Sequence, residues 1–287
     1  MFTLGFLYEI VYSDKAIFGY GFNGGNLSLT NLVSNLGVVA TDTTGVGTAR
    51  YNLAAAGYGT DKAIFSYGVS GYFTNLVSNL GVVATDTAGV GTNRSRLAAT
   101  TYGTDKAIFG FGYTGAAVSM TNLVSNAGVV ATDTAGVGTA KYWLAAAGYG
   151  VDKAIFSYGV GGYFTNLVSN LGVVATDTAG VGTSRYGLAA ACYGIDKAIF
   201  GYGFTTVVVS MTNLVSNAGV VSTDTTGVGT ARYYLAASSY GTDKAIFGYG
   251  FSTGEVSITN LVSNLGVVAT DTTGVGTARY YLAAAGY

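Results

Sequence analysis

Proline and histidine are absent from this sequence, and cysteine occurs only once. At ordinary usage a chain of 287 residues would contain about 14 prolines. Without histidine, nucleophilic catalysis lacks its most common general base, and a metal site would depend on carboxylates. The single Cys192 has no internal partner, so disulfides do not hold this fold together. No cofactor or metal is expected.

Charge is also scarce, at 9% of residues with a net charge of −1. Nucleic-acid binding needs a clustered basic face, so no nucleic-acid partner is expected. The apolar content of 49% argues against disorder. No apolar run reaches the roughly 18 residues of a membrane helix, so no membrane insertion is expected. Residues 1–13 contain Glu9 and lack a basic start, which argues against a signal peptide.

The sequence consists largely of six repeats. DKAIF recurs at spacings of 47, 44, 47, 44 and 47 residues, and each copy is followed by TNLVSN and GVV(A/S)TDT(T/A)GVGT. Self-similarity at such a period is typical of repeat architectures. We divide the chain into an N-terminal extension, residues 1–13, and six repeats covering residues 14–60, 61–104, 105–151, 152–195, 196–242 and 243–287.

Each repeat contains four strand-like pieces, for which KAIFGYG, TNLVSN, GVVATDTTGVG and RYNLAAAGYG are representative. Their β-branched and aromatic residues, broken by Gly, Asn, Asp and Ser, predict strands and turns. Four short strands per repeat predict an all-β, six-bladed β-propeller with four antiparallel strands per blade. The small side chains of LAAA suit the crowded innermost strand. A β-solenoid is the alternative.

The order R-Y-x-L-A-A-A followed by D-K-A-I-F-G-Y-G resembles the kelch repeat over residues 14–287. Here the usual double glycine is GYG, GFG or SYG, and the outer-strand tryptophan is missing, which puts descent from kelch proteins in doubt. Residues 278–287 repeat the innermost-strand motif with no second strand after it, whereas no such motif precedes the first DKAIF. We therefore expect residues 278–287 to complete the first blade, and the resemblance implies the same circular closure. The repeats also resemble those of proteins predicted from aquatic tailed phages.

Closure of this kind leaves residues 1–13 without a place in the ring. We expect this extension to act as a docking or anchor strand against another chain or a larger particle. Packing along a blade, or displacement of the C-terminal strand, is the alternative.

Catalytic motifs are weak. GxGxxG occurs at Gly19-Gly21-Gly24 and Gly110-Gly112-Gly115, but it opens no helix that would hold a pyrophosphate. Twelve of the fourteen acids are repeated aspartates, matched by repeated Lys or Arg. A structural ion pair in every repeat is the favoured interpretation, and a calcium or sodium ion in every blade is the alternative. Near-identical blades offer no single special site, so the protein is not expected to be an enzyme.

Two regions differ between the copies. One follows GYG, and the other is the second residue after the conserved Arg or Lys. In an up-and-down blade both emerge on one face, formed by the b–c loops between second and third strands and the d–a loops between blades. Neutral drift of surface loops is the alternative. The candidate binding residues on this face are Asn52, Tyr72, Arg96, Trp143, Tyr163, Tyr234, Glu255 and Tyr281.

These observations predict a non-catalytic structural or adhesive binding module, a component of a phage particle or surface assembly, with a virion or extracellular location. A glycan-binding lectin is the alternative, because tyrosines can stack on sugar faces. A consensus-designed propeller is a further alternative.

Overall fold

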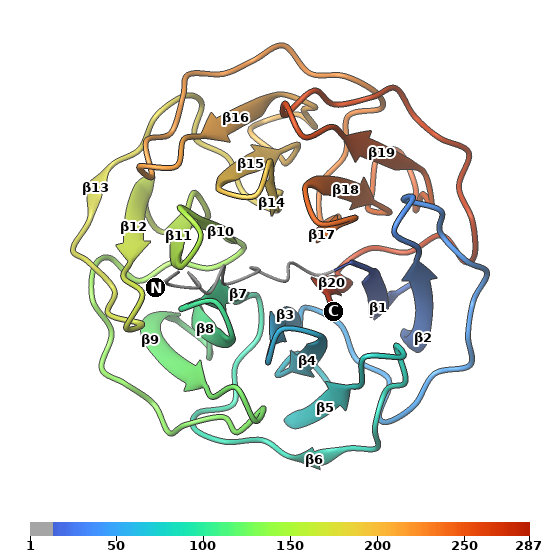
Figure 1. The fold of residues 1–287 in the computed structure, drawn as a ribbon, viewed down its shortest axis with the longest axis horizontal. Helices are drawn as coiled ribbons and strands as arrows, with labels where there is room; N and C mark the ends of the chain where they lie inside the picture. The colour runs from blue at the N-terminus through green and yellow to red at the C-terminus, as the bar shows by residue number, and fades with distance from the viewer. Residues whose placement is uncertain (1–13) are drawn as a thin grey trace, which may run out of the picture.

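The computed structural model describes residues 14–287 as six antiparallel sheets arranged in a ring around a central axis (Figure 1). The sheets have three or four strands each, and within a sheet each strand pairs with the next one in the chain, except that the first sheet also takes the last strand. Within residues 14–287 no helix is long and apolar enough to span a membrane. The predicted all-β repeat architecture is confirmed at this level.

The innermost strands carry the predicted small side chains. Each one contacts the innermost strands of the two neighbouring sheets, so that they form a closed circle around the axis. Their alanines leave room for this close approach. These strands are β3 (Ala54–Tyr58), β7 (Ala98–Tyr102), β10 (Ala145–Tyr149), β14 (Ala189–Tyr193), β17 (Ala236–Tyr240) and β20 (Ala283–Gly286).

The second strands are the most deeply buried, which explains the adjacent apolar residues of KAIF. They are β1 (Ala16–Phe22), β4 (Lys62–Ser66), β8 (Lys106–Tyr113), β11 (Lys153–Ser157), β15 (Lys197–Gly201) and β18 (Lys244–Gly248). The third strands are β2 (Asn26–Val33), β5 (Phe73–Val77), β9 (Ala117–Val124), β12 (Phe164–Val168), β16 (Thr212–Val215) and β19 (Thr259–Val262).

The expected fourth strand is largely replaced by isolated contacts. Only β6 (Thr87–Ala88) and β13 (Thr178–Ala179) form a ladder with the third strand. In the first sheet, single bridges join Thr30 to Thr43 and Val33 to Val39. Side-chain hydrogen bonds from conserved Asn and Thr residues hold this outer segment in place, as described below, so it needs no continuous ladder.

The ring closes through its C-terminal strand, as predicted. β20 pairs antiparallel with β1, with Ala16 opposite Gly286 and Gly19 opposite Ala283. The backbones of Lys15 and Tyr287 exchange two further hydrogen bonds, of 3.2 and 2.9 Å. The first sheet is therefore built from both ends of the described chain.

A buried cation lies at each junction between adjacent sheets. The guanidinium of Arg50 stacks 4.3 Å from the ring centre of Tyr20 in the β1 sheet. It donates to the carbonyl of Tyr67 at 3.0 Å and to Asn75 Oδ1 at 2.6 Å, both in the β4 sheet. A buried charge without such partners would cost about 3–5 kcal/mol. The same role is played by Arg94, Arg185, Arg232 and Arg279.

The second aspartate of each repeat completes this junction. Asp86 accepts hydrogen bonds from the backbone N and the hydroxyl of Thr48, at 2.9 and 2.7 Å, and lies 3.8 Å from Arg50. Asn75 also donates to Asp86, at 2.9 Å. Burial alone would raise the pKa of Asp86, but the Thr48 and Asn75 hydrogen bonds and the Arg50 charge lower it overall. The repeated acid–cation pair is therefore a contact between sheets.

One junction differs from the other five because Lys141 replaces the arginine. Its ammonium donates to Phe164 O and Asn166 Oδ1, both at 2.8 Å, and lies over the Phe111 ring. Burial lowers the pKa of Lys141 to about 8, although the charge of Asp177 opposes the shift. The chain therefore keeps one buried group that releases its proton at mildly alkaline pH.

This junction predicts a pH-dependent difference between the wild type and the variant Lys141→Arg. The pKa of Lys141 is lower in the folded state than in the unfolded chain, where it is about 10.5. The unfolded state therefore binds more protons above pH 8, and Lys141 adds stability as the pH rises. From pH 7 to 9 the wild type should gain about 1 kcal/mol relative to Lys141→Arg in urea unfolding. The exposed exchange Lys153→Arg should have no such effect, and equal pH slopes for wild type and Lys141→Arg would contradict the assignment.

Candidate functional site

The two variable regions lie at the same end of the axis. Bridges join Phe22 to Tyr280 and Tyr51 to Val69, which brings each b–c loop beside a d–a connection. At the other end the turns of near-constant sequence meet, because Asn126 donates to Asp105 at 3.0 Å. We call the two ends the variable face and the constant face.

A closed ring of six backbone hydrogen bonds surrounds the axis at the variable face. In each bond the N–H of one variable residue donates to the carbonyl of its counterpart in the preceding sheet, at 2.7–2.9 Å. The ring starts and ends at the same residue because Asn52 donates to Tyr281. Its members in order are Asn52, Arg96, Trp143, Gly187, Tyr234 and Tyr281.

All six ring residues have the same left-handed backbone, with φ between 51° and 63°. Glycine and asparagine accept this conformation readily, which fits Gly187 and Asn52. Arginine, tryptophan and tyrosine adopt it only when the surrounding structure imposes it, at a cost of about 1–3 kcal/mol each. The scaffold therefore fixes the backbone and leaves the side chain free to differ.

The ring side chains line a cavity of about 80 Å³ at the axis. Trp143 reaches across it: its ring lies 6.5 Å from that of Tyr281 at an angle of 8°, and its Nε1 lies 3.4 Å from Asn52 Oδ1. The rings of Tyr234 and Tyr281 lie 4.1 Å apart. Burial raises the pKa of Tyr281 to about 12 and raises that of Tyr234 still further.

Arg96 is held between aromatic rings. Its guanidinium lies 4.5 Å from the Trp143 ring centre, 4.7 Å from Tyr113 and 5.7 Å from Tyr142. Its Nε is the one buried side-chain nitrogen or oxygen of residues 14–287 that has no hydrogen-bond partner.

The sequence analysis did not identify a group of aromatic residues that surrounds the six ring residues, which we call the outer belt. Tyr142 contacts Trp143 at 5.1 Å and Tyr186 stacks on it at 5.5 Å. They belong to the tyrosines that directly precede ring residues, and phenylalanines from the b–c loops extend the contacts around most of the axis. These tyrosines are nearly constant, so differences between the repeats do not point to them. Their position directly before the variable residue is the sequence feature that could have identified them. They are Tyr51, Tyr142, Tyr186, Tyr233 and Tyr280.

Three of the predicted binding residues lie outside the axial ring. Tyr72 packs against Tyr67 of its own sheet and donates its hydroxyl to the carbonyl of Gly91. Tyr163 makes the equivalent contacts in the β11 sheet. Glu255 bridges to Phe251 at the rim, and its charge contributes to the raised pKa of Tyr280, for which burial is the larger cause.

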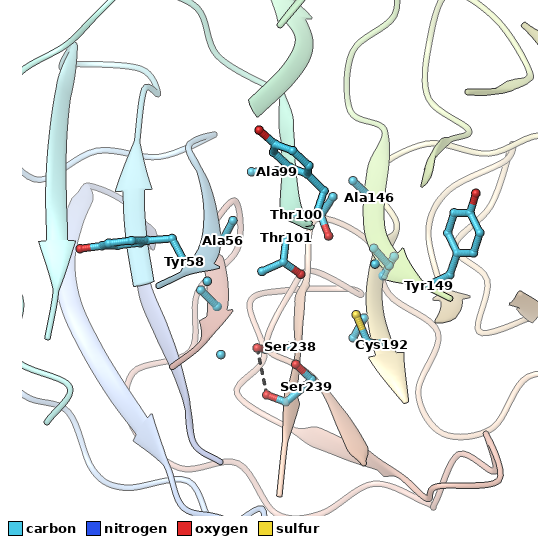
Figure 2. Close-up of a pocket in the computed structure, with 18 of the residues that line it drawn as sticks. Ala56, Tyr58, Ala99, Thr100, Thr101, Ala146, Tyr149, Cys192, Ser238 and Ser239 are labelled. Atoms are coloured by element: carbon cyan, nitrogen blue, oxygen red, sulfur yellow. Dashed lines mark hydrogen bonds between the residues drawn. The ribbon is translucent and has the colours of Figure 1, made fainter. Parts of the chain in front are cut away.

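A second cavity of about 130 Å³ follows the axis towards the constant face and is lined mainly by small side chains (Figure 2). Figure 2 shows Cys192 projecting among Ala146, Thr101 and Ser239. Burial raises the pKa of the Cys192 thiol to about 11, which makes it a poor nucleophile. This cavity therefore offers packing space and little chemistry.

The constant face carries nearly all of the large apolar side chains that are exposed in residues 14–287. Leu36 and Val38, in the turn between the third strand and the outer segment, are 77% and 63% exposed. The valine is exposed in all six sheets, whereas the leucine is replaced by Ala127 and Ala218 in two of them. Among the exposed large apolar residues, Val207 alone lies on the variable face. Exposed apolar surface repeated around a ring is typical of interaction sites.

Within residues 14–287 no group of three or more Cys, Asp or Glu side chains is arranged to hold a metal ion. No known protein-family model matches the chain, and no curated protein is significantly similar to it. The kelch resemblance therefore stays a prediction.

The left-handed ring predicts how Asn52 tolerates substitution. Asn52→Gly should change the free energy of unfolding by less than about 1 kcal/mol, because glycine accepts this backbone. Asn52→Val should cost about 1–3 kcal/mol, since a β-branched side chain is strained at positive φ. Urea unfolding of the two variants measures the difference. Equal stability would show that the ring backbone is not imposed at this position.

Proposed function

We propose that the chain folds as a six-bladed β-propeller of the kelch-like type and acts as a non-catalytic binding module. Its binding face is the variable face, formed by the b–c and d–a loops. The observation that carries this proposal is the axial ring, where one backbone conformation presents six positions occupied by Asn, Arg, Trp, Gly, Tyr and Tyr. Trp, Tyr and Arg are the residue types most enriched at binding hot spots.

The proposed role is structural or adhesive, as part of a phage particle or surface assembly. The exposed leucines and valines of the constant face support a contact with another protein, because exposed apolar patches mark interaction sites. The predicted docking strand, residues 1–13, lies outside the described residues and stays a prediction. Deleting residues 1–12 tests it by light scattering: unchanged assembly combined with lower stability would eliminate the docking role.

Glycan binding is the second candidate. The belt of half-buried tyrosines presents ring faces and hydroxyls around the axis, and sugars bind to such surfaces by stacking and hydrogen bonding. The low charge of the chain fits a ligand that is neutral or carries few charges.

The role of the variable face is tested by replacing Trp143, Tyr234 and Tyr281 together with glycine. Gly187 shows that the ring accepts glycine, so the triple variant should remain folded and should lose at least about tenfold in affinity for its ligand. A glycan array and binding to purified particle components give the readout. The matched control is Lys153→Gln, at a half-exposed position that belongs neither to the axial ring nor to the exposed leucines and valines. Unchanged ligand binding by the folded triple variant would exclude the variable face.

A further inference from the structure

Arg96 is the one lysine or arginine that has no charged counterpart in the other repeats. The other twelve Lys and Arg residues occupy repeated positions, and ten of them pair with a repeated aspartate within 4.0 Å. Arg96 has no ion pair with any residue of the described chain, and its side chain donates no hydrogen bond there. The counterparts of Arg96 in the other five sheets are all uncharged.

The surroundings of Arg96 prepare its guanidinium for a ligand. Trp143 and Tyr113 contact it at 4.5 and 4.7 Å and restrict its movement, while the residue lines the 80 Å³ axial cavity. Stacking of this kind occupies the face of the guanidinium and leaves the in-plane N–H groups to donate. Because the Arg96 side chain donates no hydrogen bond within the described chain, a ligand acceptor placed against its in-plane N–H groups would supply hydrogen bonds that the protein does not.

The chemistry of the site narrows the ligand. A guanidinium presents parallel donors that match a carboxylate or a phosphate. Arg96 is alone on the axis, and no second cation lines the cavity to balance a phosphate dianion. The half-buried tyrosines around it offer flat faces and hydroxyls, which suit a sugar ring, and the cavity is large enough for a carboxylate but too small for a bulky peptide side chain.

We propose that Arg96 binds the carboxylate of an acidic sugar, such as a sialic or uronic acid, while the neighbouring aromatic rings contact the sugar itself. The inference rests on the proposed function of the variable face as a binding surface. One arginine per ring implies one acidic sugar per protein molecule.

The sequence provides both a reporter and matched variants. Trp143 is the only tryptophan in the chain and contacts Arg96, so its fluorescence reports on the site. Arg96→Asn copies the residue found at Asn52 and should therefore preserve the backbone ring. Arg96→Lys keeps the charge without the planar donors. Lys153→Gln removes the same charge from a half-exposed position on the constant face.

The experiment is a titration with sialyllactose, trigalacturonate, lactose and a hexaglutamate peptide, followed by Trp143 fluorescence and by calorimetry. We expect the wild type to bind at least one acidic sugar with a stoichiometry near one and at least about tenfold more tightly than lactose. Arg96→Asn should lose at least about tenfold in affinity and Arg96→Lys should lose less, whereas Lys153→Gln should bind as the wild type does.

Several outcomes would overturn the inference. They are equal affinity for lactose and the acidic sugars, binding by folded Arg96→Asn that matches the wild type, binding of hexaglutamate alone, and no binding of either acidic sugar. Binding that survives Arg96→Asn but is lost in the triple glycine variant would remove the inference and leave the proposed function standing. Binding that survives both variants would remove both.

Discussion

The buried cation between adjacent sheets is the contact on which the rest of the structure depends. Arg50 stacks on one sheet and donates to the next, and Asp86 and Thr48 complete the junction. This arrangement directly precedes the ring residue in the chain, since Asn52 follows Arg50 by two positions. The buried arginine thus fixes the position of the backbone that leads into the axial ring of hydrogen bonds. The side chain two residues later is therefore free to be Asn, Arg, Trp, Gly or Tyr without loss of the fold.

The two faces of the ring differ in sequence and in the side chains that they expose. On the constant face the turns repeat almost without change and expose leucine and valine, whereas the variable face gathers tyrosine, tryptophan and the one arginine outside the repeated pattern. This contrast supports the proposed function, in which the constant face contacts an assembly and the variable face binds a ligand. The thiol of Cys192 and the small side chains along the axis contribute packing between these faces.

Much of the architecture could be predicted because the repeats report it directly. The six sheets, the small residues of β3 and its counterparts, and the pairing of β20 with β1 follow from the order of the motifs. The two variable regions were predicted to share a face because alternate connections of an up-and-down blade emerge on the same side. The partner of the second aspartate in each repeat was not predictable: Asp42 approaches Arg279 from the other end of the chain, a contact that only ring closure creates. The left-handed backbone of the ring residues could not be predicted either, because tryptophan and tyrosine have no sequence preference for positive φ.

One imposed backbone conformation presents five residue types at the six positions around the axis. Amide hydrogen exchange tests it most directly, because all six ring N–H groups donate to carbonyls at 2.7–2.9 Å. The amides of residues 52, 96, 143, 187, 234 and 281 should exchange as slowly as those of the innermost strands, whatever the side chain. Exchange of any of them at the rate of the exposed b–c loops would contradict it.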